Sequence, residues 1–350
     1  MKIRKILALT LALLLTLSLF ACAAKEKTLV IYTWADMFPE DVIADFEAAT
    51  GYKVVLATFD TDEEMLEKLQ QAKGKGYDLV IADDYILEPV IAEGLAQKLD
   101  RSKIANYGNI NSDFQKQFYD PTDAYTIPYG CGVQTIVYNP ETVTIPITGY
   151  ADLWDPSLAG RVGIIGNFRV INGMALKVLG KSYNTENLDD IRAAGAKLIE
   201  LAPNIALIED VSLEESLLSG AVDVAVMYTG NVTLALQANP NLQFVYPSEG
   251  IGFGNMPAFI PSGAANADGA HEFLNFILDP ERGAACFEWL GYYSTFAASD
   301  AYIDPAYKAF LTLPAEFNLD EVESIENISD EAVAVHNLVW SQFLEATGNA

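Results

Sequence analysis

Residues 29–55, LVIYTWADMFPEDVIADFEAATGYKVV, predict one β-loop-α-β unit. The run 29–33 is apolar and β-branched, as in a buried strand. Pro39 suits the first turn of a helix, and Gly51 suits its end. The chain then returns as a second strand at 52–59, and the two strands of such a unit are normally parallel with a right-handed crossover. The stretch therefore predicts an open α/β sheet.

Aromatic and acidic residues follow two of the expected strands. Trp34 and Asp36 follow the first strand, and a third strand at 77–82 runs into Asp84 and Tyr85. Ligands of open α/β sheets bind at the carboxyl ends of the strands. A ring face attracts a cation and a carboxylate hydrogen-bonds it, so these positions suit an ammonium or hydroxyl-bearing ligand. The alternative is that Asp83 or Asp84 caps the next helix.

The first 21 residues have the form of a bacterial lipoprotein signal peptide. A basic start precedes an apolar core at 6–20, and the small residue Ala21 precedes Cys22. A membrane-spanning anchor fits less well, because the apolar run is short for a bilayer. We expect cleavage before Cys22 and acylation of its thiol, which would tether the protein to the outer face of a membrane.

Length, charge and cysteine content narrow the class further. A chain of 350 residues is expected to form about two domains. Beyond the leader only Cys131 and Cys286 remain, both among apolar residues, and we expect no disulfide between them. The net charge of −27 argues against nucleic acid or anionic lipid as a partner of this surface. It is compatible with a cationic ligand, although an acidic surface also simply serves solubility.

Catalytic motifs are missing from the sequence. The only two histidines are His271 and His336, and Asn275 stands where a zinc-protease helix needs its second histidine. The sequence has neither a glycine-flanked serine elbow nor a phosphate-binding loop. We therefore expect no enzyme, no metal site and no cofactor. A hydrolase that uses two carboxylates is left as a less favoured alternative.

Several short motifs together resemble one known family over nearly the whole mature chain. They are YTWAD at 32–36, YDLV at 77–80 with Tyr85, IPYG at 127–130, ADLW at 151–154 and GY at 291–292. In this order they are similar to the spermidine/putrescine-type periplasmic substrate-binding proteins of ABC importers. The resemblance implies an α/β, two-lobed type II periplasmic-binding-protein fold with crossover strands and a ligand cleft between the lobes. It also implies an ABC permease and its ATPase as partners.

The expected domains follow from this fold. They are the signal peptide at 1–21, lobe 1 at 28–134 plus 256–300, and lobe 2 at 135–255 plus 301–350.

The resemblance and the strand-end pattern give one set of ligand-binding candidates. They are Trp34, Asp36, Asp84, Tyr85, Asn167, Tyr228, Asn255 and Tyr292. The family's acidic amine anchors are replaced here, at Asn167, Val170 and Met256. An ammonium group buried without a carboxylate partner costs several kcal/mol. Either Asp36, Asp84 or Asp210 supplies the missing carboxylate, or the ligand is not a di- or tricationic polyamine.

The expected function is that of a lipid-anchored, extracytoplasmic substrate-binding protein of an ABC importer. The expected ligand is putrescine, spermidine or a related cationic amine, and the alternative is another polar small solute. Two rivals from other classes are the secreted carboxylate-dependent hydrolase and a surface adhesion or sensor lipoprotein.

Overall fold

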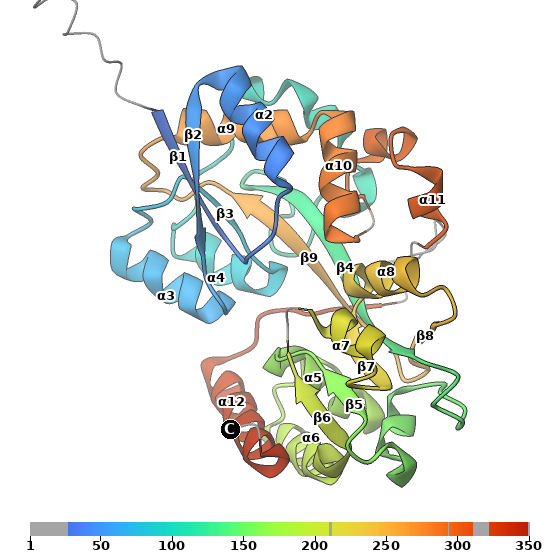
Figure 1. Cartoon of the computed structure of the whole chain (residues 1–350). Helices are drawn as coiled ribbons and strands as arrows, with labels where there is room; N and C mark the ends of the chain where they lie inside the picture. The colour runs from blue at the N-terminus through green and yellow to red at the C-terminus, as the bar shows by residue number, and fades with distance from the viewer. Residues whose placement is uncertain (1–26, 210–211, 293, 311–321, 349–350) are drawn as a thin grey trace, which may run out of the picture.

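The computed structural model of the chain describes residues 27–209, 212–292, 294–310 and 322–348. Ten strands of this part form one curved sheet in the order β2-β1-β3-β9-β4-β7-β5-β6, with β10 (Glu323–Ser324) beside β9 and β8 beside β4. Two groups of strands and helices are visible, and β4 and β9 run between them (Figure 1). We name the group that contains β1 lobe 1 and the group that contains β5 lobe 2.

The expected β-loop-α-β unit at the start of lobe 1 is confirmed. β1 (Lys27–Thr33) and β2 (Tyr52–Thr58) are parallel and are joined by α2 (Glu40–Thr50). Gly51 ends α2 in the left-handed conformation, with a φ of 74°. The next helix begins at Thr61, whose hydroxyl accepts a hydrogen bond from the Glu64 N–H at 3.2 Å.

The rest of lobe 1 comes from two parts of the chain. The first part contributes α3 (Asp62–Ala72), β3 (Leu79–Ile81) and α4 (Leu87–Ala92). The second returns after lobe 2 as β9 (Gly252–Phe259), α9 (Ala267–Ile277), α10 (Pro280–Leu290) and α11 (Pro305–Lys308). β3 is parallel to β1 and antiparallel to β9, so the returning strand closes this half of the sheet.

Lobe 2 is a second α/β unit. Its strands are β5 (Val162–Ile164), β6 (Ile205–Ile208), β7 (Val224–Tyr228) and β8 (Gln243–Val245). Its helices are α5 (Phe168–Val178), α6 (Leu188–Leu201), α7 (Leu213–Ser219), α8 (Thr229–Ala238) and the C-terminal α12 (Asp330–Thr347). β5 is parallel to both β6 and β7.

One long strand connects the lobes. β4 (Thr126–Tyr138) pairs antiparallel with β9 up to Val133, and from Gln134 onward it pairs with β7 and β8. The strand therefore leaves one half of the sheet and enters the other without a break. Cys131 lies on this strand, and both it and Cys286 are buried free cysteines.

The alternating side chains of β1 explain why its sequence is apolar throughout. Leu29 and Ile31 lie in a buried cluster with Phe46 and Phe273, whereas Tyr32 lies in the cluster on the other face. A strand covered on both faces gains from apolar residues at every position. β1 is therefore held by buried contacts on both faces, and these contacts position its carboxyl end.

The backbones of α8 and α10 meet where the end of α10 lies against lobe 2. A methyl group at Gly291 would lie 2.3 Å from the Gly230 carbonyl oxygen, and a methyl group at Gly230 would lie 2.7 Å from the Leu290 carbonyl. Gly291 also has a left-handed φ of 75°. Only glycine fits at this contact.

The contact predicts that two glycine-to-alanine substitutions with the same backbone strain lower the free energy of unfolding by different amounts. Gly51→Ala and Gly291→Ala both place alanine in the left-handed region, at φ values of 74° and 75°, which costs about 1–2 kcal/mol. Nothing lies within 4 Å of a methyl group at Gly51, whereas Gly291→Ala must also displace the Gly230 backbone. We expect Gly291→Ala to lose a further ~1–3 kcal/mol in denaturant unfolding. Equal losses of unfolding free energy in the two variants would contradict a close contact between Gly291 and Gly230.

Candidate functional site

The candidate site lies where β1 and β3 end. Because these strands are parallel neighbours, their carboxyl ends reach the same edge of the sheet. Trp34 follows β1 directly, and Asp83, Asp84 and Tyr85 follow β3 after one intervening residue. On the lobe 2 side, Tyr228 is the last residue of β7. The expected strand-end residues of lobe 1 are therefore brought to one place.

Tyr85 connects the two lobes at this place. Its side chain is 6% exposed, and its hydroxyl donates a hydrogen bond to Glu63 Oε1 at 3.1 Å. The guanidinium of Arg169, at the start of α5, lies 5.6 Å from the centroid of the Tyr85 ring. One aromatic side chain thus touches an acidic group of lobe 1 and a basic group of lobe 2.

Asp62 and Glu63 of lobe 1 both lie within hydrogen-bond distance of the Tyr85 hydroxyl, at 3.5 and 3.1 Å. Asp62 is buried, and its Oδ1 accepts the Asp83 N–H at 3.0 Å. Burial and the neighbouring charge of Asp83 raise the pKa of Asp62 well above its usual range. The proton of this pair therefore resides on Asp62, and the negative charge resides on the half-buried Asp83.

Asp83 is a candidate that the sequence did not single out. Burial and then acidic neighbours, Asp83 among them, raise the pKa of Tyr85, and burial followed by the charge of Asp83 does the same for Tyr292. The carboxylate is therefore within electrostatic reach of two phenol rings. The available signal was the Asp83-Asp84 pair itself, because adjacent residues of an extended segment point to opposite sides.

Asp84 is hydrogen-bonded to the backbone of β9. Its side chain is 1% exposed, and Oδ2 accepts the backbone N–H of Asn255 on β9 at 2.8 Å. Burial raises the pKa of this carboxyl to about 8. At neutral pH Asp84 is therefore mostly protonated, and it attaches the end of β3 to the crossover strand rather than offering a charge.

Asn255 lies in the interior. The residue is wholly buried, and neither side-chain amide atom has a hydrogen-bond partner in the described part of the chain. Its neighbours on β9, Gly254 and Met256, are half-buried on the opposite face of the strand. Burial raises the pKa of the nearby Tyr119 phenol well above its usual range. As a ligand contact, Asn255 stays a prediction.

Tyr292 fits into a slot between the lobes. A methyl group at Gly132 of β4 would lie 2.6 Å from the Tyr292 ring, and one at Gly230 of α8 would lie 3.1 Å from it. The ring therefore lies against the crossover strand and against lobe 2. Burial raises the pKa of its phenol, which stays neutral.

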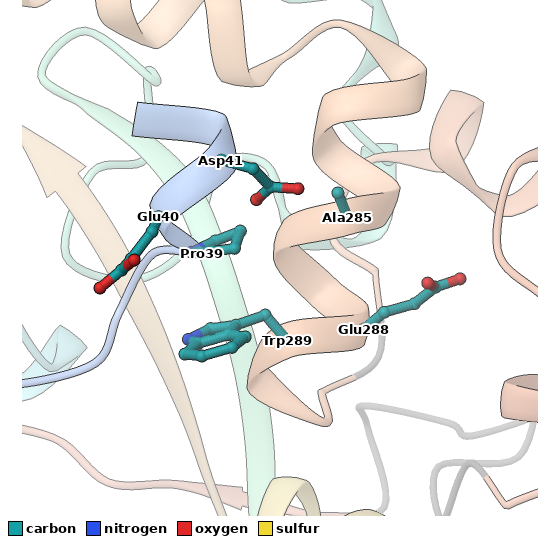
Figure 2. A pocket seen from close by; sticks show the side chains of 6 residues that line it. All are labelled: Pro39, Glu40, Asp41, Ala285, Glu288 and Trp289. Atoms are coloured by element: carbon teal, nitrogen blue, oxygen red, sulfur yellow. The ribbon is translucent and has the colours of Figure 1, made fainter. Parts of the chain in front are cut away.

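Trp34 and Asp36 lie in different surroundings in the structure. Trp34 is half-buried and contacts Phe59, with ring centroids 5.1 Å apart. Asp36 is exposed and has a left-handed φ of 58°, and its carbonyl accepts a hydrogen bond from Trp289 Nε1 at 2.6 Å. Figure 2 shows the Trp289 ring beneath Pro39 in a pocket between α2 and α10. Asp36 is thus held from the α10 side.

Asn167 has a structural role at the start of α5. Its Oδ1 accepts the N–H groups of Arg169 and Val170 at 3.0 and 3.2 Å, so the side chain caps the helix. This cap holds Arg169 in place opposite Tyr85. Arg169 was not among the sequence candidates, because a basic residue did not fit the expected amine ligand.

Some expectations fall outside the described residues. The signal peptide, Cys22 and Asp210 are among them. Within the described part, no helix is both long and apolar enough to cross a membrane, and no group of three or more His, Cys, Asp or Glu side chains is arranged to hold a metal ion.

The fold and the strand-end site define a type II substrate-binding protein of the kind that serves ABC importers. The chain belongs to the family of bacterial extracellular solute-binding proteins, whose model matches residues 41–315. Membership of this family places the protein outside the cytoplasm.

Named relatives cover most of the chain. The spermidine/putrescine-binding periplasmic protein of Escherichia coli (strain K12) is 32% identical over 286 residues, which is 81% of this chain and 82% of the relative. A solved structure from Listeria monocytogenes, assigned to a spermidine/putrescine ABC transporter, has a TM-score of 0.85 at 30% identity and covers 91% of this chain and 98% of its own. The Tp0655 (TpPotD) lipoprotein of Treponema pallidum has a TM-score of 0.79 at 25% identity, covering 91% and 99%.

The raised pKa of Asp84 predicts a pH-dependent contribution to stability. Its folded pKa of about 8 exceeds the ordinary aspartate pKa of 3.8, so the native state holds more protons than the unfolded state between these values. The contribution is complete below about pH 4 and is lost as pH rises towards 8. Relative to wild type, Asp84→Asn should therefore gain stability over this range, by at most about 1.4 kcal/mol per pH unit.

The measurement is denaturant unfolding from pH 4 to 8. Asp45→Asn, on the exposed face of α2, is the control and should run parallel to wild type. A constant difference between Asp84→Asn and wild type across the range would show that Asp84 is ionised in the folded protein.

Proposed function

We propose that this protein is the substrate-binding protein of an ABC importer and that its ligand is a cationic amine, in the class of putrescine and spermidine. The observation that carries the proposal is the half-buried Asp83 next to the buried Tyr85 after β3, at the sheet edge where Trp34 follows the parallel strand β1. A carboxylate accepts hydrogen bonds from an ammonium group, and ring faces attract it. The name of the E. coli relative, a spermidine/putrescine-binding protein, supports the same class.

The proposed binding mode is closure of two lobes around the ligand. Lobe 1 consists of 28–134 plus 256–300 and lobe 2 of 135–255 plus 301–350, with one adjustment for α11. Tyr307 of α11 donates a hydrogen bond to the Phe287 carbonyl of α10, so we extend lobe 1 through α11. A ligand that contacts both lobes stabilises the closed form by its differential affinity, and the closed form is the one presented to the permease and its ATPase.

We also propose that the mature protein is anchored by lipid at Cys22 after removal of residues 1–21. The form of the leader supports this. So does the likeness to the Treponema lipoprotein.

A carboxylate-dependent hydrolase is less well supported. The Asp62 and Asp83 side chains are hydrogen-bonding neighbours, whereas a glycosidase needs roughly 5 Å or more between its two carboxyl groups. His271 accepts the Asp100 N–H and donates to the Ala267 carbonyl, and His336 is buried beside Asn172. Both histidines therefore serve the fold.

Amine binding is tested on the purified mature protein. We expect a rise in melting temperature with at least one compound of a panel of putrescine, spermidine and 4-aminobutanol, and none with neutral sugars. Asp83→Asn should weaken binding at least tenfold, because it removes the charge that faces the ammonium group. The control is Asp60→Asn, an exposed carboxylate of the same lobe. A shift with sugars alone would reject the amine.

Trp34 is tested separately as an aromatic wall. Trp34→Ala should weaken binding of the same ligand by about 1 kcal/mol or more, the contribution of a cation–π contact at a desolvated site. Trp154→Ala in lobe 2, whose indole donates to the Lys197 carbonyl, is the matched control. Unchanged affinity in titration calorimetry would remove Trp34 from the site.

A further inference from the structure

A groove between α2 and α10 of lobe 1 is not part of the candidate ligand site. It encloses about 600 Å³, and Figure 2 shows the side chains that line it, which are Pro39, Glu40, Asp41, Ala285, Glu288 and Trp289. They come from the start of α2 and from the last two turns of α10. In this view Asp41 points into the gap between the helices, while Glu40 and Glu288 lie on its two outer sides.

Trp289 presents an exposed ring in this groove, and the orientation of the ring is fixed. The residue is 48% exposed, whereas the other three tryptophans of the chain are half-buried. Its indole N–H donates to the Asp36 carbonyl at 2.6 Å, which holds the ring beneath Pro39. A ring that is already held loses little conformational freedom when a partner packs against it. Trp289 thus has the properties of an interface anchor, a role in which tryptophan is enriched.

The carboxylates around this ring have no basic partner. Within the described ranges, Glu40, Asp41 and Glu288 form no ion pair, although other carboxylates of lobe 1 do. Glu288 is held in place by the Asp304 N–H, which donates to its Oε1 at 2.6 Å. The groove therefore offers unneutralised negative charge around an aromatic face. A guanidinium or ammonium group fits it, because the ring face attracts a cation and the carboxylates hydrogen-bond it.

The groove also lies beside the junction of the two lobes. α10 ends at Leu290, and a methyl group at Gly230 of α8 would lie 2.7 Å from the Leu290 carbonyl (Figure 1). On its other side, Trp289 holds Asp36 in the loop that follows β1. A protein that binds the groove is therefore placed next to lobe 2 and next to the strand end at the candidate site.

We infer that this groove is the docking site for the importer's permease and that it receives an arginine or lysine side chain of that protein. The inference rests on the proposed function, which supplies an ABC permease as the partner. An anionic lipid surface is a poor occupant, because both the groove and the whole chain, at −27, are negatively charged. Arginine suits the groove best, since its planar guanidinium stacks on an aromatic ring and forms two hydrogen bonds with a carboxylate.

The test measures coupling to the permease and ligand binding separately. The permease and its ATPase are reconstituted in phosphatidylcholine vesicles, and mature protein saturated with the tightest-binding amine of the panel is added. Glu40→Gln/Asp41→Asn should raise the protein concentration for half-maximal ATPase stimulation by about fivefold or more, because it removes two charges that face the basic side chain. The affinity for the amine in titration calorimetry should stay unchanged, since neither residue belongs to the ligand site.

The matched control is Asp330→Asn/Glu331→Gln at the start of α12. These residues are also exposed, adjacent and in the first turn of a helix, so both double variants lose the same charge and the same interaction with a helix dipole. The control should stimulate the ATPase like wild type. Added salt should weaken the coupling of wild type more than that of Glu40→Gln/Asp41→Asn, because fewer charges remain to be screened.

Trp289 is tested by two substitutions. Trp289→Ala should also raise the half-maximal concentration by about fivefold or more, whereas Trp289→Phe should keep most of the coupling because a ring face remains. Both variants lose the hydrogen bond to the Asp36 carbonyl, so the comparison isolates the ring. Equal losses in the two variants would assign the effect to the Asp36 contact and would contradict docking on the ring.

The outcomes separate the inference from the proposed function. If wild type does not stimulate the ATPase, the proposed function is contradicted and the inference falls with it. Stimulation that Glu40→Gln/Asp41→Asn leaves unchanged, or that the control variant weakens equally, overturns the inference and leaves the function standing. A second amine-binding event that Glu40→Gln/Asp41→Asn abolishes, with unchanged stimulation, also overturns it, because the groove then binds a small cation.

Discussion

The antiparallel pairing of β4 with β9 holds both lobes in one sheet and also determines where the site lies. β4 pairs with β9 up to Val133 and with β7 and β8 from Gln134 onward. The lobes are therefore joined by backbone hydrogen bonds and not by a loose linker. In the same region β9 directs the Asn255 N–H at Asp84. The end of β3 is therefore attached to the crossover itself, and any movement of the lobes about these strands takes place next to Tyr85.

Burial gives different roles to three neighbouring aspartates, Asp62 at the start of α3 and Asp83 and Asp84 after β3. Asp62 and Asp84 are almost completely buried, and burial favours their protonated forms. Asp83 stays half-exposed and charged beside them. Repulsion among three adjacent carboxylates is thus relieved by protonating the two that hold the structure together. Asp83, the least buried of the three, keeps its charge.

The sequence determines the local structure well and the site only in part. The apolar run of β1, Gly51 and the Thr61–Glu64 spacing predict the first helices and strands because their causes are local. The choice between Asp83 and Asp84 depends on which side of an extended segment faces β9, which is a tertiary property. The same holds for Asn255, whose neighbours on β9 face the other way. Arg169 did not fit the expected amine ligand, and its contact with the Tyr85 ring is a tertiary property that spacing along the chain does not reveal.

The total charge of −27 is a poor guide to the ligand, and Arg169 shows why. Most acidic side chains are solvated, and screening removes their influence within about 10 Å. A guanidinium buried against Tyr85 is not screened in this way, because little water reaches it. The charge of Arg169 therefore acts on its neighbours more strongly than a solvated surface carboxylate does.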